Sequence, residues 1–110
     1  MSNKPSDDSL DKIFFALSDK NRRKILKTLS KEESSVSVLA ELLSMSLPGV
    51  LKHIGILEEA KLIVQEKNGR IRSCTFNPKG FKNANSYIDD YKEFWESKLD
   101  NLEKFLQEED

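Results

Sequence analysis

Apolar residues recur every three or four positions through the first half of the chain, and this spacing predicts successive helices. Short polar residues stand where helices would begin, and their side-chain oxygens can accept the free N–H groups of a first turn. The candidate caps are Ser18 or Asp19, then Ser34 or Ser35, then Ser46. The predicted helices cover residues 9–17, 19–31, 36–43 and 46–61.

The third and fourth helices are separated by a connector of a few residues, 44–46. Two short helices with such a connector predict a helix-turn-helix. Pro48 falls in the first turn of the fourth helix, where its missing N–H costs nothing.

A strand pattern follows, because residues 62–67 and 70–76 are rich in β-branched and aromatic side chains. Asn68-Gly69 lies between them and is typical of a tight hairpin turn, since both residues tolerate positive φ. A helix-turn-helix followed by a hairpin with a basic tip is the layout of a winged helix. The basic residues of the tip are Lys67, Arg70 and Arg72.

The last helix is expected from residue 79 to residue 108, with an apolar stripe along most of its length. One small domain cannot cover so long a stripe, and exposed stripes of this kind usually mark an interface. We therefore expect a homodimer formed by the last helix and the first helix, the alternative being a helix that lies wholly on its own domain. The residues expected at the dimer interface are Leu10, Phe14, Tyr87, Ile88, Tyr91, Phe94, Trp95, Leu99, Leu102, Phe105 and Leu106.

The composition is that of an ordinary soluble protein, with a formal net charge of -1. The length of 110 residues favours one domain. Basic residues outnumber acidic ones between positions 19 and 72, and acidic residues dominate from position 89 onward. This segregation suggests a surface that meets an anion, although two solvated helix faces would give the same pattern. No membrane span or secretory leader is visible, and the single cysteine fits a reducing cytoplasm.

His53 and Cys74 are the only histidine and the only cysteine. A zinc or thiolate site needs three or four such ligands, so neither a metal nor another cofactor is expected. No motif of a nucleophilic triad and no phosphate-binding glycine loop is present, so we expect no enzymatic activity. Cys74 is expected to be a small packed residue, the alternative being a thiol sensor.

On a helical wheel the fourth helix has one apolar side and one mixed side. Leu51 is expected at the edge between them and His53 on the other shoulder. Gly55 marks either a close approach to a partner or a merely tolerated surface glycine. The core is expected to receive Leu47, Val50, Ile54 and Leu57, and the opposite side Pro48, Lys52, Gly55, Ile56 and Glu59.

The chain resembles ArsR-type winged-helix transcriptional repressors in ALSDKNRRKILKTL (16–29), SVSVLAELLSMSLPGVLKHIGILEEAKLI (35–63) and NGRIRSCTFNP (68–78). It is most similar to the subgroup without metal ligands, since the third helix lacks a cysteine pair and the last helix lacks histidine. Leu51 stands where the family usually has serine, Gly55 where a basic residue is often seen, and Lys61 where glycine is usual.

The resemblance implies a sequence-specific regulator of transcription, a homodimeric repressor that binds an inverted repeat of double-stranded DNA. The recognition helix would be 46–61 and the wing 62–76, and an unknown small-molecule or protein effector would be a further partner. The alternatives are a winged-helix dimer that contacts proteins through the outward apolar residues Leu51 and Ile56, and a thiol-responsive regulator that acts through Cys74. The expected DNA contacts are Ser46, Leu47, Pro48, Gly49, Leu51, Lys52, His53, Gly55, Lys67, Arg70 and Arg72.

The predicted fold is thus mainly α with a small β-hairpin, in the order α-α-α-α-β-β-α, dimerising through its terminal helices. Residues 1–8 are expected to form a flexible tail and residues 9–78 the DNA-binding domain. Residues 79–110 are expected to form a dimerisation helix packed on the same domain.

Overall fold

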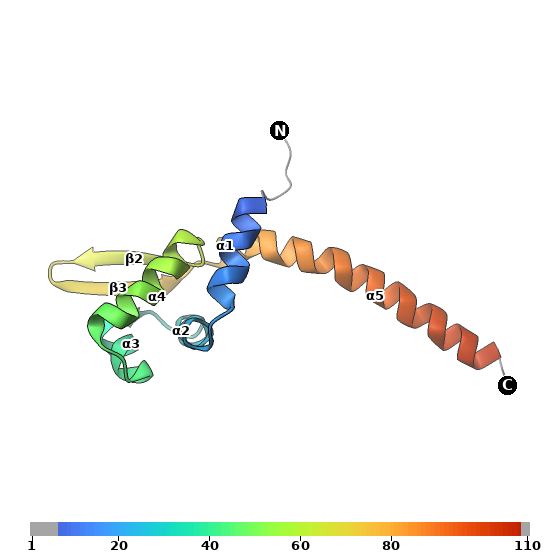
Figure 1. Ribbon diagram of the computed structural model, residues 1–110, viewed down its shortest axis with the longest axis horizontal. Helices are drawn as coiled ribbons and strands as arrows, with labels where there is room; N and C mark the ends of the chain where they lie inside the picture. Colours follow the sequence, from blue (N-terminus) through green and yellow to red (C-terminus); the bar gives the residue numbers. More distant parts are fainter. Residues whose placement is uncertain (1–6, 109–110) are drawn as a thin grey trace.

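The computed structural model describes residues 7–108, which form a winged helix-turn-helix (Figure 1). The predicted order of four helices, a hairpin and a last helix is confirmed. The first helix begins at Asp7, inside the segment predicted to be a flexible tail, and residues 1–6 of that segment lie outside the described residues. The elements are α1 (Asp7–Leu17), α2 (Lys20–Leu29), β1 (Ser34–Ser35), α3 (Val36–Leu43), α4 (Leu47–Glu59), β2 (Ile63–Asn68), β3 (Ile71–Phe76), the 3-10 turn η1 (Pro78–Phe81) and α5 (Lys82–Glu108).

Side-chain caps fix the starts of α2, α3 and α4, as the sequence predicts. Asp19 accepts the backbone N–H groups of Asn21 at 2.7 Å and Arg22 at 3.2 Å. These hydrogen bonds, that of Arg22 first, lower the pKa of the Asp19 carboxyl group. Ser35 and Ser46 cap α3 and α4 in the same way.

The sheet has three antiparallel strands in the order β1-β3-β2. The sequence did not predict β1, because two residues are too few to show an alternating pattern. The hairpin turn lies one residue later than predicted, since Asn68 pairs with Ile71 and leaves Gly69 and Arg70 as the turn. Gly69 has a φ of 63° and Arg70 has a negative φ, the pattern of a type II′ turn.

A single core fills the space between the sheet and the first four helices. α4 lies at its centre, because α1, α2, α3 and β2 all contact it. The largest fully buried side chains are Ile13, Ile25, Leu39, Val50, Ile54, Leu57, Leu62, Ile63 and Cys74.

The start of α5 is fixed against the end of α4. The side-chain amide of Asn77 donates to the carbonyl oxygen of Lys61 at 2.8 Å. A Cβ atom on Gly80 would overlap that same carbonyl, so only glycine fits there. The chain forms a 3-10 turn at this close approach, and the prediction of α-helix from residue 79 is wrong by three residues.

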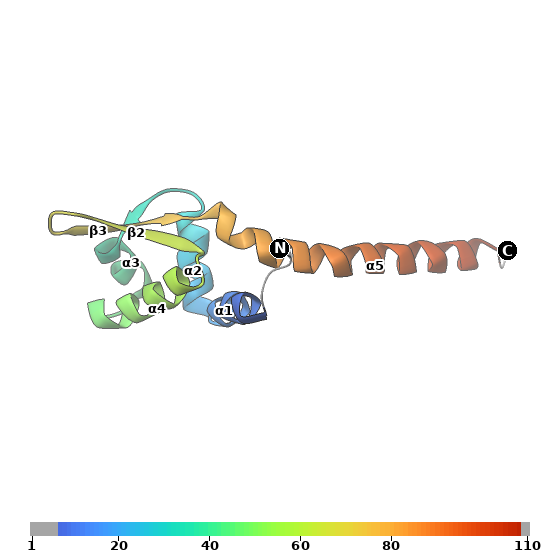
Figure 2. The ribbon, with the colours of Figure 1, turned by 90° about the horizontal axis from the view of Figure 1, so that it is seen from above.

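Beyond its first turns α5 runs away from the core (Figures 1 and 2). Ala84 is the only buried residue of this helix within the described chain. The expectation that the helix packs on its own domain is therefore wrong for most of its length. None of the helices in residues 7–108 is long and apolar enough to cross a membrane.

Lys61 adopts a left-handed backbone conformation, with a φ of 64°. It follows Ala60, the C-cap residue of α4. The N–H of Lys61 donates to the carbonyl of Glu58 at 2.9 Å, and the N–H of Leu62 donates to the carbonyl of Leu57 at 3.0 Å. This pair of bonds is a Schellman motif, in which glycine is the favoured residue at the left-handed position. A lysine there strains the backbone, because its Cβ approaches the following carbonyl.

Replacing Lys61 with glycine should therefore stabilise the protein. We expect Lys61→Gly to raise the free energy of unfolding by about 1 kcal/mol, since the relieved strain exceeds the added entropy of the unfolded chain. Urea denaturation followed by circular dichroism measures the change. Lys61→Ala is the control, because alanine removes the long side chain but keeps the Cβ atom. Equal stability of the two variants would contradict the strain.

Candidate nucleic-acid interface

α4 turns one side toward the core and leaves its first turn uncovered. Val50, Ile54 and Leu57 are buried as predicted, but Leu47, predicted to be in the core, is 49% exposed. Ile56, predicted to point outward, packs partly against the core. Both differences have one cause. Four elements contact α4, so burial depends on where they lie along the helix and not only on the angle around it.

The wing carries its positive charge on the same face of the sheet as the core. Arg72 shares this face with buried Cys74, two residues further along β3. Lys67 lies directly opposite Arg72 in the strand ladder, and like charges in that position repel one another. These two facing cations therefore lie across from the helix-turn-helix. An anion bound there would reduce the repulsion between Lys67 and Arg72.

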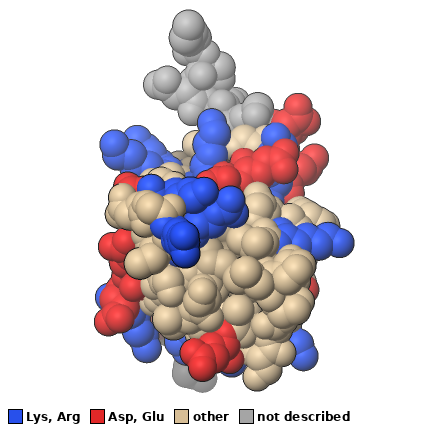
Figure 3. Space-filling model, turned by 90° about the vertical axis from the view of Figure 1, so that its left-hand side faces the viewer, with Lys and Arg blue, Asp and Glu red and all other residues tan. Residues whose placement is uncertain are grey.

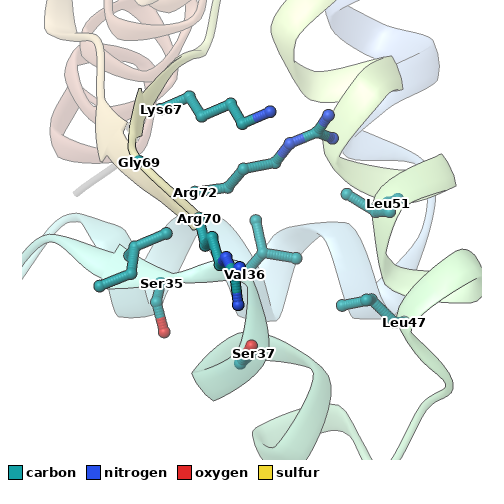
Figure 4. A pocket seen from close by; sticks show the side chains of 10 residues that line it. Ser35, Val36, Ser37, Leu47, Leu51, Lys67, Gly69, Arg70 and Arg72 are labelled. Atoms are coloured by element: carbon teal, nitrogen blue, oxygen red, sulfur yellow. The ribbon is translucent and has the colours of Figure 1, made fainter.

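A groove of about 670 Å³ separates the wing from the helix-turn-helix. In Figure 4 the side chains of Lys67 and Arg72 extend from the wing toward α4, whose Leu47 and Leu51 form the other wall. Figure 3 looks at the molecule from the wing tip and shows Lys and Arg near the centre and top, with Asp and Glu beside them at the upper right, above a largely uncharged middle. The remaining lining residues are Ser35, Val36, Ser37, Gly69, Arg70 and Ile71.

The groove contains some of the residues predicted to contact DNA, and the others lie on the outer surface of α4. Inside it lie Leu47, Leu51, Lys67, Arg70 and Arg72. Gly49 and His53 are half-buried, whereas Ser46, Pro48, Lys52 and Gly55 are exposed. A Cβ atom on Gly55 would meet nothing within 4 Å, so internal packing does not require glycine there. The sequence reasoning missed the start of α3 as a wall of the groove, although the Ser35 cap marked its position.

Arg22 is a second residue that the sequence reasoning missed. It is 6% exposed, and its Nη1 lies 3.1 Å from Nδ1 of His53 on α4. A signal was present, because Arg22 precedes Ile25 by three residues and Leu29 by seven, which places it on the buried face of α2.

Cys74 is fully buried in β3. Burial, and then the nearby carboxylate of Glu58, raise the pKa of the Cys74 thiol to about 11. No three His, Cys, Asp or Glu side chains within residues 7–108 come together in a way that could hold a metal ion.

The apolar stripe of α5 is exposed along its whole length. Tyr87 is 39% exposed and Trp95 is 62% exposed. Phe14 of α1 continues the stripe, since its ring meets that of Tyr87 edge-on with centroids 5.7 Å apart. The other exposed members are Ile88, Tyr91, Phe94, Leu99, Leu102, Phe105 and Leu106, and Leu10 of α1 is half-buried.

Comparison with known proteins places this arrangement in a family. Residues 17–66 match a family model described as a helix-turn-helix domain. The solved ArsR family transcriptional regulator RHA00566 has a TM-score of 0.79 and 36% sequence identity, over 86% of this chain and 97% of that one. The chain belongs to the ArsR family.

Two relatives of this ArsR family member are Bacillus subtilis (strain 168) proteins. The uncharacterized HTH-type transcriptional regulator YuzN is 34% identical over 66% of this chain and 87% of its own. The transcriptional repressor SdpR is 33% identical over 62% of this chain and 76% of its own. The protein is therefore a DNA-binding transcriptional regulator, and the groove and the outer surface of α4 are its candidate interface with DNA.

Cys74 of this ArsR family member should react slowly with thiol reagents. With a pKa near 11, about one thiol in a thousand is ionised at pH 8, and the thiolate is the reactive form. We expect iodoacetamide to alkylate the native protein at least about 100-fold more slowly than the protein unfolded in urea. Mass spectrometry over time gives both rates. Equal rates would show an accessible, ionised thiol and revive the thiol-sensor hypothesis.

Proposed function

We propose that the protein is a homodimeric repressor that binds an inverted repeat in double-stranded DNA. The observation that carries this proposal is the groove between the basic wing and the uncovered first turn of α4. A DNA strand is the anion that fits it, because one wall offers Lys67, Arg70 and Arg72 and the other offers the start of a recognition helix.

In this proposal the first turn of α4 enters a major groove. The positive end of the helix dipole favours a phosphate, and Lys52 extends from the same exposed surface. Small residues on this surface would allow the DNA backbone to come close. They are Ser46, Pro48, Gly49 and Gly55. The wing reaches the neighbouring backbone or minor groove through Arg70 and its two basic neighbours.

The apolar side chains of the first turns suggest how bases would be read. Leu47 is half-exposed and Leu51 lines the groove beside it. In a major groove such side chains pack against the C5 methyl group of thymine. The proposed operator therefore contains A·T pairs beneath α4.

A second copy of the chain is the proposed cover of the α5 stripe. The helix of 27 residues is about 40 Å long, and its stripe stays exposed from Tyr87, whose ring meets Phe14 of α1, to Leu106. A twofold axis along the stripe would present two recognition helices to successive turns of one duplex, which is why the proposed operator is an inverted repeat.

The repressor role rests on the similarity to the transcriptional repressor SdpR. We expect the protein to work in the cytoplasm, with the DNA that it binds. An alternative function, protein contact through the helix-turn-helix, is favoured by the exposure of Val38, Leu42 and Leu47 on α3 and α4. The half-buried Ile56 takes no part in this surface.

Removing the wing-tip charge should weaken binding to every DNA sequence. We expect Arg70→Ala to lower affinity and to flatten the dependence of log affinity on log salt concentration by about one unit, because one phosphate contact is lost. Gel-shift titration at several salt concentrations measures this on the upstream region of the protein's own operon. Lys104→Ala, which removes the same charge from the far part of α5, is the matched control.

Two outcomes would count against this function. An unchanged salt slope in Arg70→Ala would remove the wing from the interface. If the unmodified protein binds its upstream region no better than unrelated DNA at moderate salt, the protein-contact alternative becomes the better explanation.

A charge in the α5 stripe should separate the two copies. We expect Leu99→Glu to convert the dimer to a monomer, because the added carboxylate would be buried without a partner. Ser97→Glu adds the same charge on the polar side of α5 and should remain dimeric. Analytical ultracentrifugation gives both masses. A monomeric unmodified protein would overturn the dimer, and a dimeric Leu99→Glu variant would place its interface elsewhere.

A further inference from the structure

Arg22 is the only charged side chain that the core buries among residues 7–108. Its Nε donates to the carbonyl of Ala16 at 2.8 Å, and its Nη2 donates to the carbonyl of Phe15 at 3.0 Å. Both carbonyls belong to the last turn of α1, the negative end of that helix. The guanidinium also lies 5.0 Å from the centre of the Phe15 ring. Three neighbouring groups of α1 therefore hold Arg22 in one position.

The third hydrogen bond of Arg22 determines where His53 carries its proton. Nη1 of Arg22 lies 3.1 Å from Nδ1 of His53. A guanidinium has only donors and keeps its proton in proteins, so Nδ1 must be the acceptor. A neutral imidazole whose Nδ1 accepts a hydrogen bond carries its proton on Nε2. Arg22 thereby selects one of the two tautomers of His53.

The opposite nitrogen of the same ring is open to the outside. Nε2 of His53 makes no hydrogen bond within the described residues, and no buried side-chain nitrogen or oxygen there lacks a partner. Nε2 is therefore accessible to solvent. It sits on α4 next to exposed Lys52, on the helix proposed to enter the major groove.

We propose that Arg22 is a positioning residue that holds His53 as an Nε2–H donor, and that His53 gives this hydrogen bond to a phosphate oxygen of the DNA backbone. A phosphate oxygen fits because it only accepts hydrogen bonds and is charged, which makes the bond stronger than one between neutral groups. The contact depends on the proposed function, DNA binding, but on no particular base sequence.

The tautomer can be read directly, because His53 is the only histidine of the chain. Two-bond ¹H–¹⁵N spectra of the ¹⁵N-histidine-labelled protein at slightly alkaline pH should show a protonated Nε2 and a bare Nδ1. Arg22→Lys keeps the charge but lacks the fork of donors, so it should give a mixture of tautomers in a protein that still melts cooperatively. A proton on Nδ1 in the unmodified protein, or an unchanged spectrum in Arg22→Lys, would overturn the positioning role.

Two substitutions of His53 test the contact with DNA. His53→Gln places its amide nitrogen near the position of Nε2 and keeps a donor, whereas His53→Asn reaches only the position of Nδ1. On a mixed-sequence DNA duplex we expect His53→Asn to lose affinity about tenfold, and His53→Gln to stay within about twofold of the unmodified protein.

The outcomes separate this inference from the function on which it rests. Equal affinity of His53→Asn and the unmodified protein would overturn the phosphate contact while leaving DNA binding intact. Failure of the unmodified protein to bind any duplex would overturn both the function and the contact. The spectra of the free protein would still decide whether Arg22 sets the tautomer.

Discussion

The burial of one side of α4 is the constraint on which the rest of the structure depends. Val50, Ile54 and Leu57 have no exposed surface, and α1, α2, α3 and β2 all pack around them. Because those three side chains fix the rotation of the helix, they also decide which residues face outward. The Schellman end at Lys61 then directs the chain into β2, so the position of the wing follows from the same helix.

In the proposed complex, α4 and the wing supply different contacts to DNA. The outward side of α4 is poor in charge, with Lys52 as its one exposed cation and apolar Leu47 and Leu51 nearby. The wing supplies the missing cations from across the groove, and Lys67 and Arg72 remain opposite each other despite their repulsion. In the proposed complex, most of the cations that attract phosphate therefore lie on the wing, whereas the apolar side chains that would meet the bases lie on α4.

Most of the fold could be predicted, because its signals are local. Caps such as Asp19, Ser35 and Ser46, and the spacing of Ile54 and Leu57, each act within one or two turns. The errors concern contacts between distant segments. Strand β1 has only two residues and so no pattern of its own. The turn η1 lies where Gly80 meets the Lys61 carbonyl. Leu47 is exposed because the elements that contact α4 do not cover its first turn. The Arg22–His53 pair joins residues 31 positions apart, and the sequence alone cannot show that they meet.

The exposed stripe of α5 has a consequence for how the regulator responds to its own abundance. With a second copy as cover, part of the free energy that keeps α5 helical comes from association, so it depends on protein concentration. In the proposed dimer, dilution would separate the copies and fray the helix in one process. Occupancy of a paired DNA site would fall more steeply than protein concentration, since both halves of the binding unit are lost together. In the proposed dimer, the occupancy of the DNA site would therefore depend on the number of copies of the protein.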